Sequence, residues 1–134
     1  MQDLRDFATL RLPVEGDMFA TDGSLVRILL RLQCGAMAHF ELSAGQTSHA
    51  VTHKTVDEIW FFLSGQGQMW RKIGDHEEVS DVGAGVCLTI PLGTHFQWRS
   101  TGDEPLAAIG VNIPPWPGEG EAQIVTGIWK ATVP

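Results

Sequence analysis

Short apolar segments, each closed by a turn residue, recur along this sequence. They are rich in Val, Ile, Leu, Phe and Trp and end at Gly, Pro, Asp or Ser, which is typical of β-strands. In residues 37–42, Ala38, Phe40 and Leu42 alternate with the other side chains, which predicts one buried face and antiparallel pairing. The predicted strands are Leu25–Gln33, Met37–Leu42, Ala50–His53, Glu58–Leu63, Gly67–Ile73, Val86–Ile90, Phe96–Ser100 and Leu106–Asn112.

The length and the turn residues favour one all-β domain. A chain of 134 residues builds one compact core, and its 15 glycines and 7 prolines suit many short elements. We expect a single domain over 1–134. Residues 1–20 and 114–134 are richer in Pro, Gly and acid, so we expect them to wrap the barrel or reach a partner. Because exposed strand edges need cover, a homodimer is predicted.

The charge disfavours two classes of partner. Acidic residues number 16 and basic residues 9, giving a net charge of −7 that repels nucleic acid and anionic membrane surfaces. No apolar run reaches the roughly 20 residues that span a bilayer, and a cytoplasmic location is expected. Cys34 and Cys87 lie among apolar residues, which predicts buried, reduced thiols without a disulfide.

The segment Gly45–Gly65 concentrates residues that could carry chemistry. His49 and His53 share a strand parity, so both imidazoles project to one side if the segment is extended. Glu58 begins the next predicted strand and can approach His53. Two imidazoles and a carboxylate could hold one divalent Fe, Mn, Ni, Co or Zn ion with open positions, with Glu58 as ligand or catalytic base. Alternatively, His53 and Glu58 are hydrogen-bonded interior residues without a metal.

A second segment, Gly85–Ser100, leaves two alternatives open. His95, Gln97 and Arg99 share one parity, and Phe96 and Trp98 share the other. If the first set faces inward, His95 is a further nitrogen ligand, Gln97 is an oxygen ligand or a substrate contact, and Arg99 lies in the substrate pocket. If the second set faces inward, the barrel interior is drier.

Three other side chains are assigned from their positions in the pattern. Trp60 shares parity with Glu58, so it is predicted to line the same pocket. His39 and His76 are predicted to lie at the surface or at a sheet edge.

The two segments together resemble the motifs of the cupin family. Gly45, His53, Glu58 and Gly65 stand at the spacing of the family's first motif. The second motif is matched by the residues Gly85, Pro91 and Gly93. The resemblance implies an antiparallel jelly-roll β-barrel with a small-molecule pocket, and a range of metal-dependent reactions that includes those of dioxygenases and isomerases.

The chain departs from the family pattern at two ligand positions. Val51 stands where the family has its first histidine, with His49 as a possible substitute, and Phe96 stands where the second motif has its histidine. Two functions are therefore weighed. One is a divalent-metal-dependent enzyme acting on a small oxygenated organic molecule, and the other is a ligand-binding or sensing module without metal. A largely structural dimer is the third possibility.

Overall fold

Eleven β-strands form the regular structure of residues 6–134, the part of the chain that the computed structural model describes. They are β1 (Met18–Phe19), β2 (Leu25–Arg31), β3 (Ala36–Leu42), β4 (Val51–His53), β5 (Asp57–Ser64), β6 (Gln66–Ile73), β7 (His76–Gly83), β8 (Cys87–Ile90), β9 (His95–Ser100), β10 (Leu106–Ile113) and β11 (Ala122–Ile124). Over these residues, no helix is long and apolar enough to cross a membrane. The prediction of an all-β chain is confirmed.

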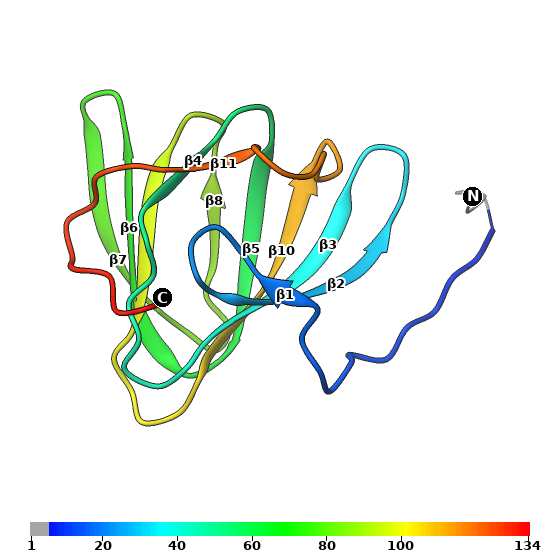
Figure 1. Cartoon of the computed structure of the whole chain (residues 1–134), viewed down its shortest axis with the longest axis horizontal. Helices are drawn as coiled ribbons and strands as arrows, with labels where there is room; N and C mark the ends of the chain where they lie inside the picture. Colours follow the sequence, from blue (N-terminus) through cyan, green and yellow to red (C-terminus); the bar gives the residue numbers. More distant parts are fainter. Residues whose placement is uncertain (1–5) are drawn as a thin grey trace.

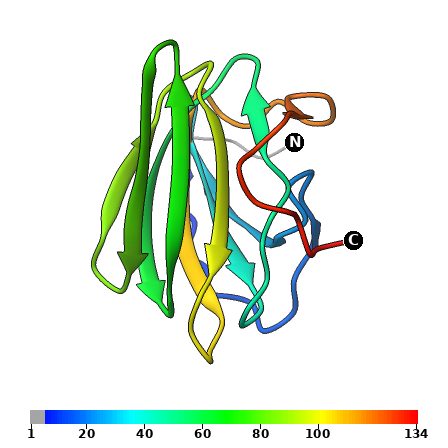
Figure 2. The same ribbon diagram turned by 90° about the vertical axis from the view of Figure 1, so that its left-hand side faces the viewer.

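The strands are arranged in two antiparallel sheets (Figure 1). One sheet has six strands in the order β1-β2-β3-β10-β5-β8, and the other has five in the order β11-β4-β9-β6-β7. Figure 2 looks onto the five-stranded sheet, with the C-terminal segment crossing beside β4. Consecutive strands often lie in different sheets, as in the predicted jelly-roll barrel.

All eight predicted strands are present, each with ends within two residues of the predicted ones. Three strands were missed. β1 and β11 are only two and three residues long. β7 pairs with β6 along its whole length, but it is an edge strand whose side chains are mostly exposed. Its residues therefore lack the apolar alternation by which the other strands were recognised.

The core lies between the sheets and is built largely from aromatic side chains. On β5, Glu58, Trp60 and Phe62 are buried, whereas the residues between them are exposed. The Trp60 ring lies 4.9 Å from Phe40 in a stacked arrangement and 5.0 Å from Trp98 in an edge-to-face arrangement, measured between centroids. Such pairs add to the free energy gained by burying the rings.

Two expectations about burial are wrong. Cys34 and Cys87 are free, as expected, but both are exposed. Cys87 begins β8 and alternates with buried Leu88, so it points outward. His39 is buried rather than superficial, because Arg27 covers it, with Nη1 lying 3.4 Å from Nδ1 of His39. His76 is exposed, as expected.

Gly110 on β10 makes room for the aromatic stack. Its strand lies between β3 and β5. A Cβ atom at this position would lie 2.6 Å from the Phe40 ring and 3.0 Å from the Trp60 ring. A side chain here would displace one of these rings, so the glycine is a condition for the packing between them.

We predict that Gly110→Ala lowers the free energy of unfolding by about 1–3 kcal/mol, the usual cost of overpacking a core. Gly102→Ala is the matched control, because a Cβ atom there meets its nearest neighbour at 3.5 Å. Urea denaturation followed by tryptophan fluorescence measures both. Equal stability of Gly110→Ala and the unsubstituted protein would contradict the packing argument.

Candidate functional site

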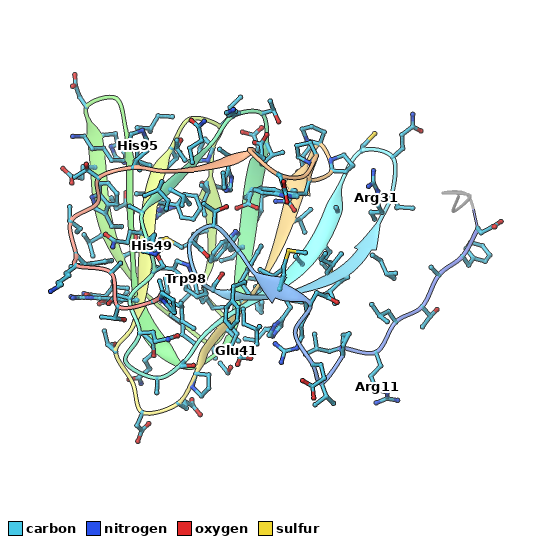
Figure 3. The ribbon with its side chains drawn as sticks, viewed as in Figure 1. Arg11, Arg31, Glu41, His49, His95 and Trp98 are labelled. Carbon is cyan, nitrogen blue, oxygen red and sulfur yellow. The ribbon has the colours of Figure 1, made fainter. Side chains whose placement is uncertain are left out.

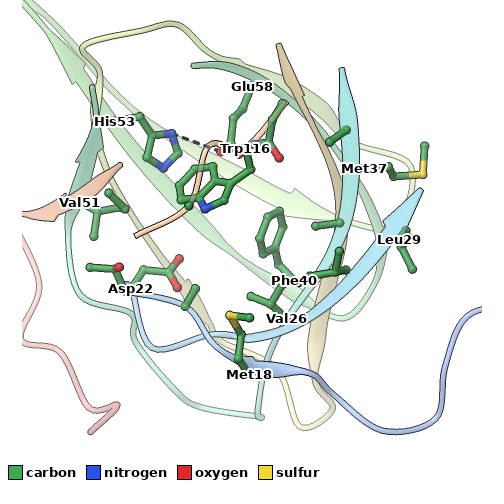
Figure 4. Close-up of a pocket in the computed structure, with 18 of the residues that line it drawn as sticks. Met18, Asp22, Val26, Leu29, Met37, Phe40, Val51, His53, Glu58 and Trp116 are labelled. Atoms are coloured by element: carbon green, nitrogen blue, oxygen red, sulfur yellow. Dashed lines mark hydrogen bonds and ion pairs between the residues drawn. The ribbon is translucent and has the colours of Figure 1, made fainter. Parts of the chain in front are cut away.

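A cavity of about 650 Å³ lies between the two sheets (Figure 4). Its walls are mainly apolar, with Val26, Phe40 and Trp60 on the six-stranded sheet and Val51 and Phe96 on the other. The polar and charged lining residues are Thr21, Asp22, Arg31, His53, Glu58, Asn112 and Glu119. Few polar groups on apolar walls are typical of a pocket for a small organic molecule.

Glu58 places a carboxyl group in this apolar surrounding. It is only 2% exposed, and the alternation of β5 turns it inward. Oε1 accepts a hydrogen bond from Nε1 of Trp60 at 3.1 Å, and Oε2 accepts one from the side-chain amide of Asn112. Burial raises the pKa of Glu58 to about 8, although the two hydrogen bonds favour the ionised form. At neutral pH the carboxyl group is therefore mostly protonated.

His53 faces Glu58 from the end of β4. Nδ1 of His53 lies 3.7 Å from Oε1 of Glu58, which is too far for a hydrogen bond. This nitrogen is buried and has no hydrogen-bond partner. The imidazole meets Phe96 and Trp116 edge to face, with centroids 5.2 Å and 5.0 Å away. Burial lowers the pKa of His53, so its ring is neutral at pH 7.

Two more buried carboxylates lie near the site, and the oxygens of both accept hydrogen bonds from neighbouring residues. Oδ1 of Asp22 accepts hydrogen bonds from the backbone and hydroxyl of Ser24, and Oδ2 accepts one from Nε1 of Trp98 at 2.9 Å. Glu121 accepts hydrogen bonds from Thr55 at 2.6 Å and 2.7 Å, and one from the backbone of Val56 at 3.2 Å. Burial would raise the pKa of Glu121, but these hydrogen bonds hold it below its ordinary value.

The sequence analysis missed several lining residues. Asn112 is the one polar side chain in Leu106–Ile113, a signal that it faces a special environment. Asp22 stands two residues before Ser24, a spacing suited to a local side-chain turn, but nothing in that spacing points to a cavity. Trp116 follows two prolines outside any strand, and no periodicity places it.

Three of the predicted site residues, His53, Glu58 and Trp60, line the cavity. His49 does not, because residues 48–50 are not in a strand and the alternation from Val51 does not extend back to it. Its backbone nitrogen donates to Asp22, and Nε2 lies 3.1 Å from the carbonyl oxygen of Pro134. Figure 3 shows the positions of His49 and His95 in the fold.

In the second motif, the side chains of Phe96 and Trp98 point into the barrel, whereas those of His95 and Gln97 do not. His95 is exposed. Gln97 is buried on the other side of the sheet, where its side chain bonds the backbone of Ser48 and of Trp129 in the C-terminal segment.

Arg99 also lies outside the cavity. It bonds Gln68, and its guanidinium lies 4.2 Å from the centre of the Trp129 ring. Gln97 and Arg99 thus help to hold the C-terminal segment against the five-stranded sheet. Sequence alternation could not reveal that the C-terminal segment covers the side of the sheet on which Gln97 and Arg99 lie.

The donor atoms in the cavity do not fit a resident metal ion. Of the five predicted ligands, only His53 and Glu58 meet, and the described residues contain no group of three His, Cys, Asp or Glu side chains that could hold a metal. Val51 and Phe96, at the family's other ligand positions, bring apolar atoms to the same place. Two protein donors fall short of the three or four that N/O metal sites use.

The fold matches solved structures of low sequence identity. A recombinant oxalate oxidase in complex with glycolate aligns with a TM-score of 0.72 and 18% identity over 92% of this chain and 65% of its own. An oxalate decarboxylase with Mn(II) centres, from Bacillus subtilis, aligns with a TM-score of 0.68 and 19% identity over 83% of this chain and 30% of its own. A protein from Bacillus halodurans gives 0.64 and 20% identity, over 78% of this chain and 80% of its own.

These identities show the fold alone, and this chain spans 30% of the length of the oxalate decarboxylase chain. A search of the curated proteins found no match. The family model for the cupin domain matches residues 38–112, which is more than half of the chain and contains both sequence motifs. The chain therefore belongs to the cupin family.

Proposed function

We propose that this cupin binds a small, largely apolar organic molecule without net charge and holds one of its oxygen atoms between His53 and Glu58. The observation that carries the proposal is the buried, unpartnered Nδ1 of His53, 3.7 Å from Oε1 of Glu58. A buried polar atom without a partner costs free energy, which a ligand hydroxyl or carbonyl group beside it could recover. The apolar walls would take the rest of the molecule.

The charges of the lining residues argue against a dicarboxylate such as oxalate. Asp22, Glu58 and Glu119 bring carboxyl groups to the cavity. Arg31, on the exposed end of β2, is the lone Lys or Arg among the described lining residues. An anion would lack a buried cation to compensate for its lost hydration. We therefore do not propose oxalate, which appears in the names of the structural neighbours, as a ligand of this chain.

The same pair of side chains could transfer protons, which makes an enzyme the second candidate. A protonated Glu58 and a neutral His53, with pKa values displaced in opposite directions, form an acid and a base at pH 7. With a ketone bound, Glu58 would give its proton to the carbonyl oxygen while His53 takes one from the adjacent carbon. The enol forms, and return of a proton to the same carbon restores the ketone with exchange of its α-hydrogen; return of the proton to a different atom would complete an isomerisation.

We predict that acetophenone binds about 5–10-fold more tightly than ethylbenzene, since one hydrogen bond contributes about 1 kcal/mol. Oxalate should bind at least tenfold more weakly than acetophenone. His53→Ala and Glu58→Ala should reduce the difference between the two aromatic probes, whereas the exposed control positions His76→Ala and Glu104→Ala should not. Titrations followed by tryptophan fluorescence and NMR measure the affinities.

Preferential binding of oxalate, or equal affinity of the two aromatic probes, would contradict the proposed ligand class. The acetophenone samples also test the second candidate. In D₂O, loss of the methyl proton signal above the background rate, abolished by either pocket substitution, would support proton transfer by the pair. If the methyl protons exchange only at the background rate, the pocket binds its ligand without catalysing proton transfer.

A divalent metal cofactor stays a prediction from the family resemblance. The Mn(II) centres of one structural neighbour support a metal cofactor, whereas the side chains that line this cavity do not. We expect protein purified without chelator to carry less than about one tenth of an equivalent of Fe, Mn, Ni, Co or Zn by elemental analysis. Binding of an oxygenated probe should then be insensitive to EDTA.

A full equivalent of metal that falls at least tenfold in His53→Ala and Glu58→Ala, but not in His76→Ala, would contradict this expectation. The metal-dependent enzyme predicted from the sequence would then replace the metal-free pocket.

A further inference from the structure

A second groove, of about 470 Å³, lies outside the barrel beside the C-terminal segment. On its floor Lys72 of β6 pairs in register with His95 of β9, which points out of the barrel, so the groove lies on the outer face of the five-stranded sheet (Figure 3 labels His95). Its charged, imidazole, aromatic and aliphatic lining side chains are Trp70, Lys72, Ile73, Glu77, His95 and Ile128. None of these residues lines the cavity between the sheets.

Three polar side chains form a row across the floor of this groove. Lys72 has His95 of β9 as its cross-strand partner on one side and Glu77 of β7 on the other. The Cβ atoms of such partners lie about 4.5–5.5 Å apart. The imidazole supplies an N–H donor in either protonation state. The row therefore consists of a donor, a cation and an anion.

The ammonium group of Lys72 and the carboxylate of Glu77 are not paired with each other. Within residues 6–134, Lys72 forms no ion pair. Oε2 of Glu77 instead accepts a hydrogen bond from Nε1 of Trp70 at 2.7 Å, and Trp70 is only 3% exposed. The buried indole thus orients the carboxylate, and because the indole is a neutral donor it leaves the negative charge in place. Both charges are available to a ligand.

The C-terminal segment forms a fixed wall of the groove. Oε1 of Gln97 accepts hydrogen bonds from the backbone nitrogens of Ile128 at 3.1 Å and Trp129 at 3.0 Å. A Cβ atom at Gly127 would collide with the same side chain, so the segment lies directly against the sheet. Ile128 and Ile73 are 46% and 42% exposed, and they offer apolar surface for a ligand to cover.

We propose that this groove binds a free α-amino acid with an apolar side chain, as its zwitterion. The carboxylate would lie between Lys72 and His95, and the ammonium group would lie at Glu77. One carbon atom joins the two charged groups of an α-amino acid, so they can meet neighbouring members of the row. The apolar side chain would cover Ile73 and Ile128.

The order of charges in the row favours a zwitterion over a simple ion. An anion held by Lys72 would also lie close to the carboxylate of Glu77, and an amine held by Glu77 would lie close to the ammonium group of Lys72. A zwitterion places an opposite charge at each position and adds no net charge. The groove lies outside the cavity, so this inference and the function proposed above can fail independently.

An NMR titration that follows the indole N–H of Trp70 tests the site, because this group donates to Glu77. Comparison with Trp70→Phe assigns the resonance. The probes are L-leucine, 4-methylpentanoate, which lacks the ammonium group, and 3-methylbutylamine, which lacks the carboxylate. We expect L-leucine to bind at least about fivefold more tightly than either analogue, because each analogue loses one charge-assisted hydrogen bond.

Substitutions test the assigned roles of the two charged residues. Lys72→Gln and Glu77→Gln should each weaken L-leucine binding at least about fivefold. Lys54→Gln and Glu104→Gln make the same changes at exposed positions outside the groove and should leave the affinity unchanged. Binding of acetophenone by Lys72→Gln should equal that of the unsubstituted protein, since Lys72 does not line the cavity.

Three results would each overturn the proposal. The first is a Trp70 indole resonance that does not move with L-leucine at about 10 mM, well above the millimolar range of weak binding. The second is equal affinity for the three probes. The third is L-leucine binding that is indifferent to both Lys72→Gln and Glu77→Gln.

Discussion

The burial of the Glu58 carboxyl group is the constraint on which the rest of this site depends. The group lies 2% exposed among aromatic rings, where an ionised carboxylate would be costly. Its oxygens are met by the indole of Trp60 and the amide of Asn112, and His53 faces it from the opposite sheet. The position of Trp60 depends in turn on the stack with Phe40. The packing around Gly110 and the chemistry of the pocket are therefore linked.

This environment selects among the functions that the cupin fold can support. At the two positions where the family has further histidines, Val51 and Phe96 make the cavity drier, so only His53 and Glu58 remain of the family's ligand set. A protonated acid beside a neutral imidazole suits an oxygen atom of an uncharged molecule better than an anion. The proposed function follows from these substitutions, whereas the fold alone would allow a much wider choice.

Much of the fold could be predicted because alternation and turn residues act locally. Strands with one buried face, such as β5, carry both signals, and the spacing of His53, Glu58 and Trp60 placed these three residues in the cavity. β7 is bounded by turn residues but lacks the alternation, because its partner β6 gives it hydrogen bonds and does not bury its side chains.

The errors in the site came from contacts between segments distant in sequence. Gln97 is buried, but on the side of its sheet that the C-terminal segment covers, and alternation cannot distinguish one covered face from another. His49 precedes the strand whose parity was extended to it. Asn112 reaches Glu58 across neighbouring strands, a contact fixed by the register of β10 and β5.

The most direct test of this account is a ¹³C NMR titration of the Glu58 carboxyl carbon, assigned by comparison with Glu58→Gln. The buried, aromatic surroundings predict a pKa of about 8, so the carboxyl resonance should still be that of the protonated acid at pH 6.5. A transition near the ordinary value for glutamate would mean that Glu58 is ionised and solvated at neutral pH, and would contradict the proposed acid and base pair.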